Sequence, residues 1–106
     1  MGALYVVRSN AVEGREAEFN EWYTNVHLPE VMALEGLRSA ERFELDDEHS
    51  AGEQPHRYLA IYEIDAEDIP GTLENLKNAG FSLSDAIDLA SLQVSVFSSL
   101  GDRLEE

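Results

Sequence analysis

The spacing of apolar residues switches along this sequence between the two periods that distinguish strands from helices, and this switch constrains the fold most. The run Leu4–Val7 is β-branched and aromatic and is followed by turn-forming residues, so residues 3–9 predict a strand. From Glu13 the spacing becomes helical. One stripe of an amphipathic helix then holds residues at i, i+3, i+4, i+7 and i+8, namely Phe19, Trp22, Tyr23, Val26 and His27.

A proline marks the end expected for this helix. Pro29 disfavours helical geometry at Leu28, so the helix should stop or kink after His27, and residues 29–34 can form a short second turn. Residues 37–46 then alternate as a strand that we expect near a sheet edge or a subunit contact, because one face is charged. One face of this strand holds Leu37, Ser39, Glu41, Phe43 and Leu45. The other holds Arg38, Ala40, Arg42 and Glu44.

The rest of the chain predicts two more strands and a second helix. Residues 46–55 are polar and turn-rich, as in an exposed connection. Residues 56–65 hold the strongest strand pattern, which we place centrally; one of its faces carries Tyr58, Ala60, Tyr62 and Ile64. Residues 68–78 predict a helix, residues 89–100 predict the last strand, and residues 81–88 fit either a loop or another helical turn.

This order of elements is β-α-β-β-α-β, which predicts a ferredoxin-like α+β fold with a four-stranded antiparallel sheet. A chain of 106 residues fits a single domain, so we assign residues 1–106 to one. Two helices cover only one face of such a sheet. The other face still bears apolar side chains, and a second copy of the sheet is its simplest cover, so we expect a homodimer, here a dimeric α+β barrel.

The charge of the chain argues against several classes of partner. Seven basic residues against 22 acidic ones give a formal net charge of −15, which repels phosphate backbones and anionic lipid surfaces. We therefore expect no nucleic acid and no membrane as partners. The absence of cysteine excludes disulfides and thiolate metal sites. The sequence has no signal-peptide pattern and no apolar run of the ~20 residues a membrane span needs, so a cytoplasmic location is expected.

Residues 19–43, from Phe19 through Trp22-Tyr23, His27 and Pro29 to Phe43, resemble the signature region of EthD-like proteins in the dimeric α+β barrel superfamily. Residues 57–64 are similar too, and the order of elements extends the resemblance over roughly the whole chain. The resemblance implies the fold. For function it leaves open cofactor-free monooxygenases, cyclases, isomerases, haem-degrading enzymes and proteins without known activity. It also implies a pocket between the first helix and the sheet, to which only Tyr23 and His27 carry over.

His27 is the first candidate for a catalytic residue. Its imidazole changes charge near neutral pH and can therefore act as a general acid or base, with Tyr23 one turn earlier on the sheet-facing stripe as its partner. The alternative is a histidine that caps the helix or bonds a neighbouring backbone group. The sequence alone favours neither.

The candidates for substrate binding are Phe19, Trp22, Arg42, Tyr58 and Tyr62. Trp22 and Phe19 would form aromatic walls, although aromatic residues at helical spacing are usually core, and the two tyrosines could bring hydroxyls to the same cavity. Arg42 could hold an anionic or enolate-like oxygen. An ion pair of Arg42 with a carboxylate such as Glu44 or Glu63 is the favoured alternative.

These residues predict a cofactor-independent enzyme that acts on a small, mostly apolar carbonyl or phenolic compound, of the cyclase, isomerase, lyase or monooxygenase type. The alternative is a protein of the same fold that binds a small molecule without turning it over. No cofactor is expected. A metal site built from His27, His49 and His56 is disfavoured because no shared helix or strand spacing brings them together.

Overall fold

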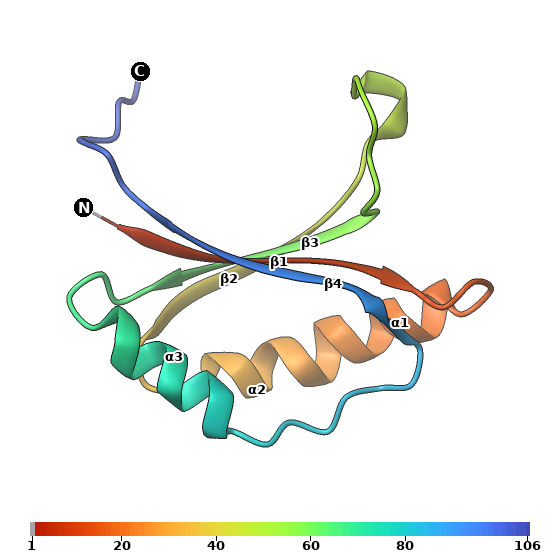
Figure 1. Cartoon of the computed structure of the whole chain (residues 1–106), viewed down its shortest axis with the longest axis horizontal. Coiled ribbons are helices and arrows are strands. Elements are labelled where there is room, and N and C mark those ends of the chain that lie inside the picture. The colour runs from red at the N-terminus through yellow and green to blue at the C-terminus, as the bar shows by residue number, and fades with distance from the viewer. Residues whose placement is uncertain (1) are drawn as a thin grey trace.

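Four strands form one antiparallel sheet, and the helices lie on one side of it (Figure 1). The structure is a computed structural model that describes residues 2–106. Along the chain the elements are β1 (Ala3–Ala11), α1 (Glu16–Trp22), η1 (Tyr23–His27), α2 (Leu28–Met32), β2 (Leu37–Glu44), η2 (Asp47–His49), β3 (Tyr58–Ile64), α3 (Ile69–Asn78) and β4 (Ile87–Ser98). The strand order across the sheet is β2-β3-β1-β4, with all neighbours antiparallel. The predicted α+β fold class is confirmed.

The helical segments α1, η1 and α2 follow one another without a break, so the expectation that Pro29 stops the first helix is wrong. Leu28 has helical dihedral angles, and its N–H donates to the carbonyl of Tyr23, five residues earlier. This wider π-type turn immediately precedes Pro29. In a regular α-helix the proline ring would clash with the carbonyl four residues before it, and the change of hydrogen-bond register at η1 avoids that conflict.

The central strands β1 and β3 carry the core on the side that faces the helices. The face predicted for β3 is buried, from Tyr58 through Ala60 and Tyr62 to Ile64. Each residue pairs with a β1 residue of the same face, as Tyr62 does with Tyr5. The prediction of a central position for β3 is confirmed, and so is the edge position of β2.

The first residue of β2 does not lie on its predicted face. The register of β2 against β3 shifts between Leu37 and Ser39, and this bulge places Leu37 opposite Ile64, where it packs against the core. The turn before it depends on Gly36, whose φ is +99°, and a Cβ there would clash with the side chain of Thr72. A glycine is thus required where β2 passes close to α3.

The connection between α3 and the last strand contains no helical turn. Residues 81–86 form loop and turn, so the second helical turn considered for this region is absent, and β4 begins at Ile87 rather than at residue 89. Strand β4 is an edge strand, and most of its residues are exposed. No helix within residues 2–106 has both the length and the apolar character required to cross a membrane.

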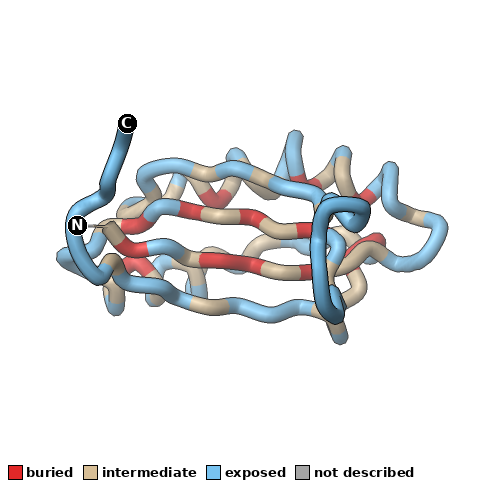
Figure 2. Tube along the Cα trace, turned by 90° about the horizontal axis from the view of Figure 1, so that it is seen from above, coloured by how far each residue is buried: buried red, intermediate tan, exposed pale blue. Residues whose placement is uncertain are grey.

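The sheet face away from the helices is open within the described chain (Figure 1). Leu4, Phe43 and Phe97 lie on it, with exposures of 37%, 42% and 50%. Figure 2 looks along the perpendicular direction, and its buried positions run through the middle of the sheet while the edges are exposed. An apolar surface of this extent is a candidate for association.

Candidate functional site

A cavity of about 260 Å³ lies between the helices and the sheet. It is bounded by β1, β3 and β4 on the sheet side, by α1, η1, α2 and α3 on the helix side, and by the loop after α3. Its lining residues are mostly apolar or aromatic: Tyr5, Val7, Trp22, Tyr23, His27, Val31, Tyr62, Leu73, Leu76, Lys77, Phe81, Leu83, Ile87, Leu92 and Val94. This volume is slightly below the range of about 300–1,000 Å³ found for drug-sized ligands, so the cavity suits a small ligand.

The ring of His27 is held between aromatic side chains at this cavity. Trp22 stacks on it with a centroid distance of 4.8 Å and an interplanar angle of 19°. Tyr23 and Phe81 meet it edge-on at 5.0 and 5.1 Å. Trp22 and His27 are five residues apart, the spacing that the π-type turn brings to one side of the helix. The same turn leaves Val26 48% exposed, so its predicted place on this stripe is wrong. The imidazole side chain is only 12% exposed.

The electrostatic surroundings keep the His27 ring neutral near pH 7. Burial lowers its pKa from the usual value of 6.5, and the negative charge of Glu30 opposes that shift. His27 Nδ1 and Glu30 Oε1 are 3.9 Å apart, and neither atom has a hydrogen-bond partner among the described residues. His27 therefore offers the cavity a neutral imidazole with a carboxylate behind it.

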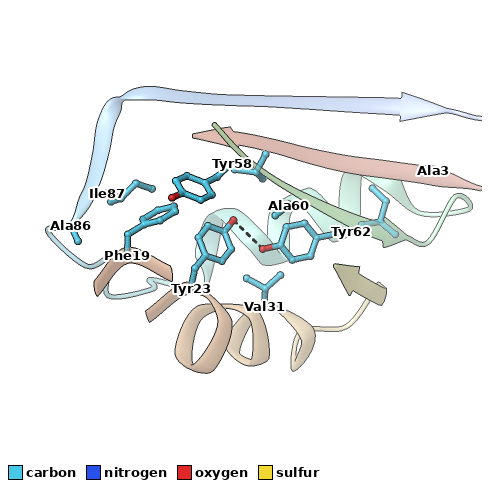
Figure 3. Close-up of a cluster of buried hydrophobic side chains, with 11 residues drawn as sticks. Ala3, Phe19, Tyr23, Val31, Tyr58, Ala60, Tyr62, Ala86 and Ile87 are labelled. Carbon is cyan, nitrogen blue, oxygen red and sulfur yellow. Dashed lines mark hydrogen bonds between the residues drawn. The ribbon is translucent and has the colours of Figure 1, made fainter. Parts of the chain in front are cut away.

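Two tyrosine hydroxyls meet at the inner wall of the cavity. The hydroxyl oxygens of Tyr23 and Tyr62 are 3.2 Å apart, in hydrogen-bond contact across the gap between η1 and β3 (Figure 3). Burial raises the pKa of both hydroxyls, so both stay protonated at physiological pH. One hydroxyl donates to the other, and the second proton is free to reach a ligand oxygen.

Arg42 lies on the other side of Tyr23 and does not line this cavity. Its guanidinium carbon is 4.6 Å from the centroid of the Tyr23 ring, and its N–H groups donate to Asn20 Oδ1 at 2.9 Å and Thr24 Oγ1 at 3.0 Å. Within residues 2–106 no carboxylate lies at ion-pair distance from it, so the favoured pairing with Glu44 or Glu63 is wrong. Aromatic faces and neutral oxygens take the place of that ion pair.

The structure gathers only part of the predicted site. The residues that line the cavity are Trp22, Tyr23, His27 and Tyr62. The others are displaced from it. Phe19 is fully buried in the core, and Tyr58 packs on it at 5.1 Å while its hydroxyl accepts from Asn20 (Figure 3). Phe19 and Arg42 contact the Tyr23 ring, and Tyr58 packs on both of them.

Sequence reasoning missed several residues of the site. Glu30 lies three residues after His27, a spacing at which helical neighbours meet, and this signal was available. Lys77 lines the cavity from α3, one helical turn after Leu73, which also lines it. Phe81 belongs to the loop after α3, and no local pattern marks it as a neighbour of His27.

The other two histidines are engaged elsewhere. His49 Nδ1 lies 2.9 Å from Asp46 Oδ2 in the exposed connection, and His56 Nε2 lies 2.8 Å from the carbonyl oxygen of Ser91. Among residues 2–106 no group of three or more histidine or carboxylate side chains is arranged to hold a metal ion.

Comparisons with known proteins agree with this fold. A family described as "Domain of unknown function (DUF4286)" matches residues 2–71. An ethyl tert-butyl ether d (EthD) family protein from Bacillus halodurans C-125 is similar in structure, with a TM-score of 0.66 and 18% identity over 94% of this chain and 100% of that chain. The EthD-like resemblance of residues 19–43 is thereby confirmed at the level of the fold. No curated protein matches the sequence.

Two further solved structures share the architecture. HapK from Hahella chejuensis has a TM-score of 0.58 and 17% identity, covering 100% of this chain and 99% of that chain. A proposed monooxygenase from Shewanella loihica PV-4 has a TM-score of 0.57 and 12% identity, covering 96% of this chain and 99% of that chain. Likeness at this level of identity shows the fold alone.

Proposed function

This chain belongs to the DUF4286 family, and we propose that it is a single-domain, homodimeric, cofactor-independent enzyme for a small, mostly apolar carbonyl or phenolic compound. His27 is its general acid or base. The observation that carries the proposal is a neutral imidazole, with burial as the main cause of its lowered pKa, at an apolar cavity of about 260 Å³. A group of this kind can take a proton at neutral pH because it is not already charged.

The polar groups of the cavity suit proton abstraction next to a carbonyl group or from a phenol. His27 takes the proton, and negative charge then develops on the substrate oxygen. The hydroxyl proton left free by the pairing of Tyr23 with Tyr62 can be donated to that oxygen. The mostly apolar lining strengthens both interactions because electrostatic attraction is stronger in surroundings of low polarity than in water. This step can begin a cyclisation, an isomerisation or an elimination of a carbonyl compound, and the oxygenation of a phenol.

The homodimer follows from the open sheet face. Leu4, Phe43 and Phe97 are exposed there, and Ile61 of the central strand lies on the same side. A second copy would cover this surface with like residues, as expected for an isologous interface. Light scattering at micromolar concentration tests this, and a stable monomer of 11.8 kDa would contradict it.

The function is tested by identifying the molecule that co-purifies with the protein by native mass spectrometry and assaying its turnover. His27→Ala should lower turnover by about 10²–10⁴-fold, the usual effect of losing a general acid or base, while the melting temperature stays nearly unchanged. Val26→Ala is the matched control, since Val26 precedes His27 and is 48% exposed. Tight binding without turnover would instead support a binding protein of this fold.

A further inference from the structure

His27 and Glu30 present to each other two buried atoms that lack hydrogen-bond partners within residues 2–106. The atoms are His27 Nδ1 and Glu30 Oε1, separated by 3.9 Å. Buried polar atoms in native proteins are nearly always paired, since an unpaired one loses its hydration without compensation. The two unsatisfied atoms face each other, so each can satisfy the other after a small movement.

We propose that Glu30 is the positioning residue of this site, and that its carboxylate accepts the Nδ1 proton of His27 and so leaves the Nε2 lone pair for the ligand. The inference rests on the proposed function only in giving Nε2 a reacting role. Catalytic hydrogen bonds are often long without a ligand and tighten when one binds. We therefore expect the gap between the two atoms to close when the cavity is filled.

The packing around the ring restricts His27 to this arrangement. The stacked Trp22 and the edge-on Phe81 fix the plane of the imidazole. Nδ1 is buried, so the ring edge that reaches the cavity is the one that carries Nε2. A ring turned by 180° would place a carbon against the carboxylate and leave Oε1 without a partner.

No carboxylate among the described residues lines the cavity, and Glu30 meets the His27 ring from outside the cavity lining. The titratable groups that face it besides His27 are the hydroxyls of Tyr5, Tyr23 and Tyr62 and the ammonium group of Lys77 on α3. The hydroxyls are neutral at physiological pH because burial raises the pKa of each tyrosine. Glu30 is therefore the negative charge that the His27 ring meets.

The test measures the tautomer and the pKa of the His27 imidazole directly and needs no substrate. Two-bond ¹⁵N–¹H spectra of the full-length, ¹⁵N-labelled chain between pH 4 and 9 give the tautomer and the pKa of His27, assigned with a His27→Gln sample. In the unmodified protein we expect the Nδ1–H tautomer. Glu30→Gln keeps an acceptor but removes the charge. It should retain that tautomer and lower the pKa of His27 by about half a unit to one unit, as expected for one carboxylate at this distance.

Glu30→Met removes the acceptor as well and should shift the neutral ring toward the Nε2–H tautomer that predominates in free histidine. Glu21→Gln on the exposed side of the same helical run should change neither quantity. An Nε2–H tautomer in the unmodified protein would overturn the inference, as would a pKa that Glu30→Gln leaves unchanged. If Glu30→Met fails to fold by circular dichroism, the Glu30→Gln result decides.

These measurements separate the inference from the proposed function. If the protein shows the predicted tautomer and pKa changes but turns over no ligand, the pairing of His27 with Glu30 stands and the proposal of an enzyme is wrong. Turnover that depends on His27 but not on Glu30 gives the opposite result. In that case the general base stands and its positioning by Glu30 is wrong.

Discussion

The two sides of the Tyr23 ring differ in how far their polar groups are satisfied. On one side Arg42 stacks at 4.6 Å and is bonded to Asn20 and Thr24. On the other side His27 meets Tyr23 edge-on at 5.0 Å, and its Nδ1 has no hydrogen bond within the described chain. Both sides were predicted as parts of one site. Only the His27 side borders the cavity.

The difference separates a structural role from a functional one. A charged group whose donors are bound and whose faces are stacked has little capacity left for a ligand, so the Arg42 side holds α1 against β2. The His27 side borders the cavity and keeps a buried polar atom, His27 Nδ1, unpaired within the described chain, which proteins retain mainly where it serves a purpose. We therefore expect substitutions on the Arg42 side to change stability, and substitutions on the His27 side to change chemistry.

The largest effect on stability is expected at Phe19, which has no exposed surface and contacts the Arg42 side of the cluster. Phe19→Ala removes a fully buried ring and should lower the free energy of unfolding by about 3–5 kcal/mol. Urea denaturation measures it. Val26→Ala, on the exposed side of the same helical run, is the control and should change stability by about 0.5 kcal/mol or less. A small loss at Phe19 would mean that this side is not the core.

Arg42→Met comes next. It keeps the length of the side chain but removes its hydrogen bonds and its cation–π contacts with Tyr23 and Phe19. We expect stability to fall by about 1–3 kcal/mol, since the half-buried Asn20 loses its partner and three aromatic rings lose a stacked cation. The affinity for a small aromatic probe such as 2-naphthol, measured by calorimetry, should not change.

Arg38→Met is the matched control on the same strand. Arg38 is exposed and pairs with Asp65 at 3.4 Å, so its loss should cost at most about 1 kcal/mol. If Arg42→Met weakens the binding of 2-naphthol while stability is unchanged, the structural role assigned to Arg42 is wrong. Arg42 would then belong to the site, as the sequence suggested.

The fold could be predicted from the spacing of apolar residues, because the strands and helices of this chain differ clearly in that spacing. The alternation of Tyr58, Ala60, Tyr62 and Ile64 gave the central strand, and the order of elements gave the sheet. The spacing of apolar residues did not predict two local features. The π-type turn at η1 and the bulge after Leu37 each change the register by one residue, and such changes depend on tertiary packing rather than on composition.

The candidate site was predicted only where the chain itself brings residues together. Trp22, Tyr23 and His27 share a helical stripe, and Tyr62 lies on the buried face of its strand, so these four were identified. Lys77 and Phe81 come from α3 and the loop after it, and nothing local places them at the cavity. Arg42 was assigned to the right face of β2, but the sequence does not show which side of Tyr23 it takes.

Tyr62→Phe tests the cavity side of Tyr23, because the two tyrosine hydroxyls are in hydrogen-bond contact there. Loss of the hydroxyl leaves the buried Tyr23 hydroxyl without its partner, and we expect stability to fall by about 0.5–1.5 kcal/mol. Tyr5→Phe is the control. The Tyr5 ring lies 5.9 Å from that of Tyr62, and its hydroxyl makes no hydrogen bond within residues 2–106, so little change is expected. Equal losses would mean that the hydroxyl pair contributes nothing specific.

The smallest expected effect is a dependence of stability on pH that arises from His27. Burial lowers the pKa of His27 in the folded protein below its usual value of 6.5, and Glu30 offsets part of this. Above pH 6.5 the ring is neutral in both states, and the folded protein keeps its full stability. As the pH falls below 6.5, the unfolded chain takes up the proton first, so the free energy of unfolding decreases until the pH reaches the lowered pKa.

Urea denaturation between pH 5 and 8 of the unmodified protein and of His27→Gln isolates this contribution, because the many carboxylates contribute equally to both. As the pH falls, the unmodified protein should lose more stability than His27→Gln does. An increase instead would show that the attraction of Glu30 outweighs burial and that His27 carries its proton in the folded state. The ring would then act as an acid toward the ligand rather than as a base, and the two sides of Tyr23 would both be positively charged.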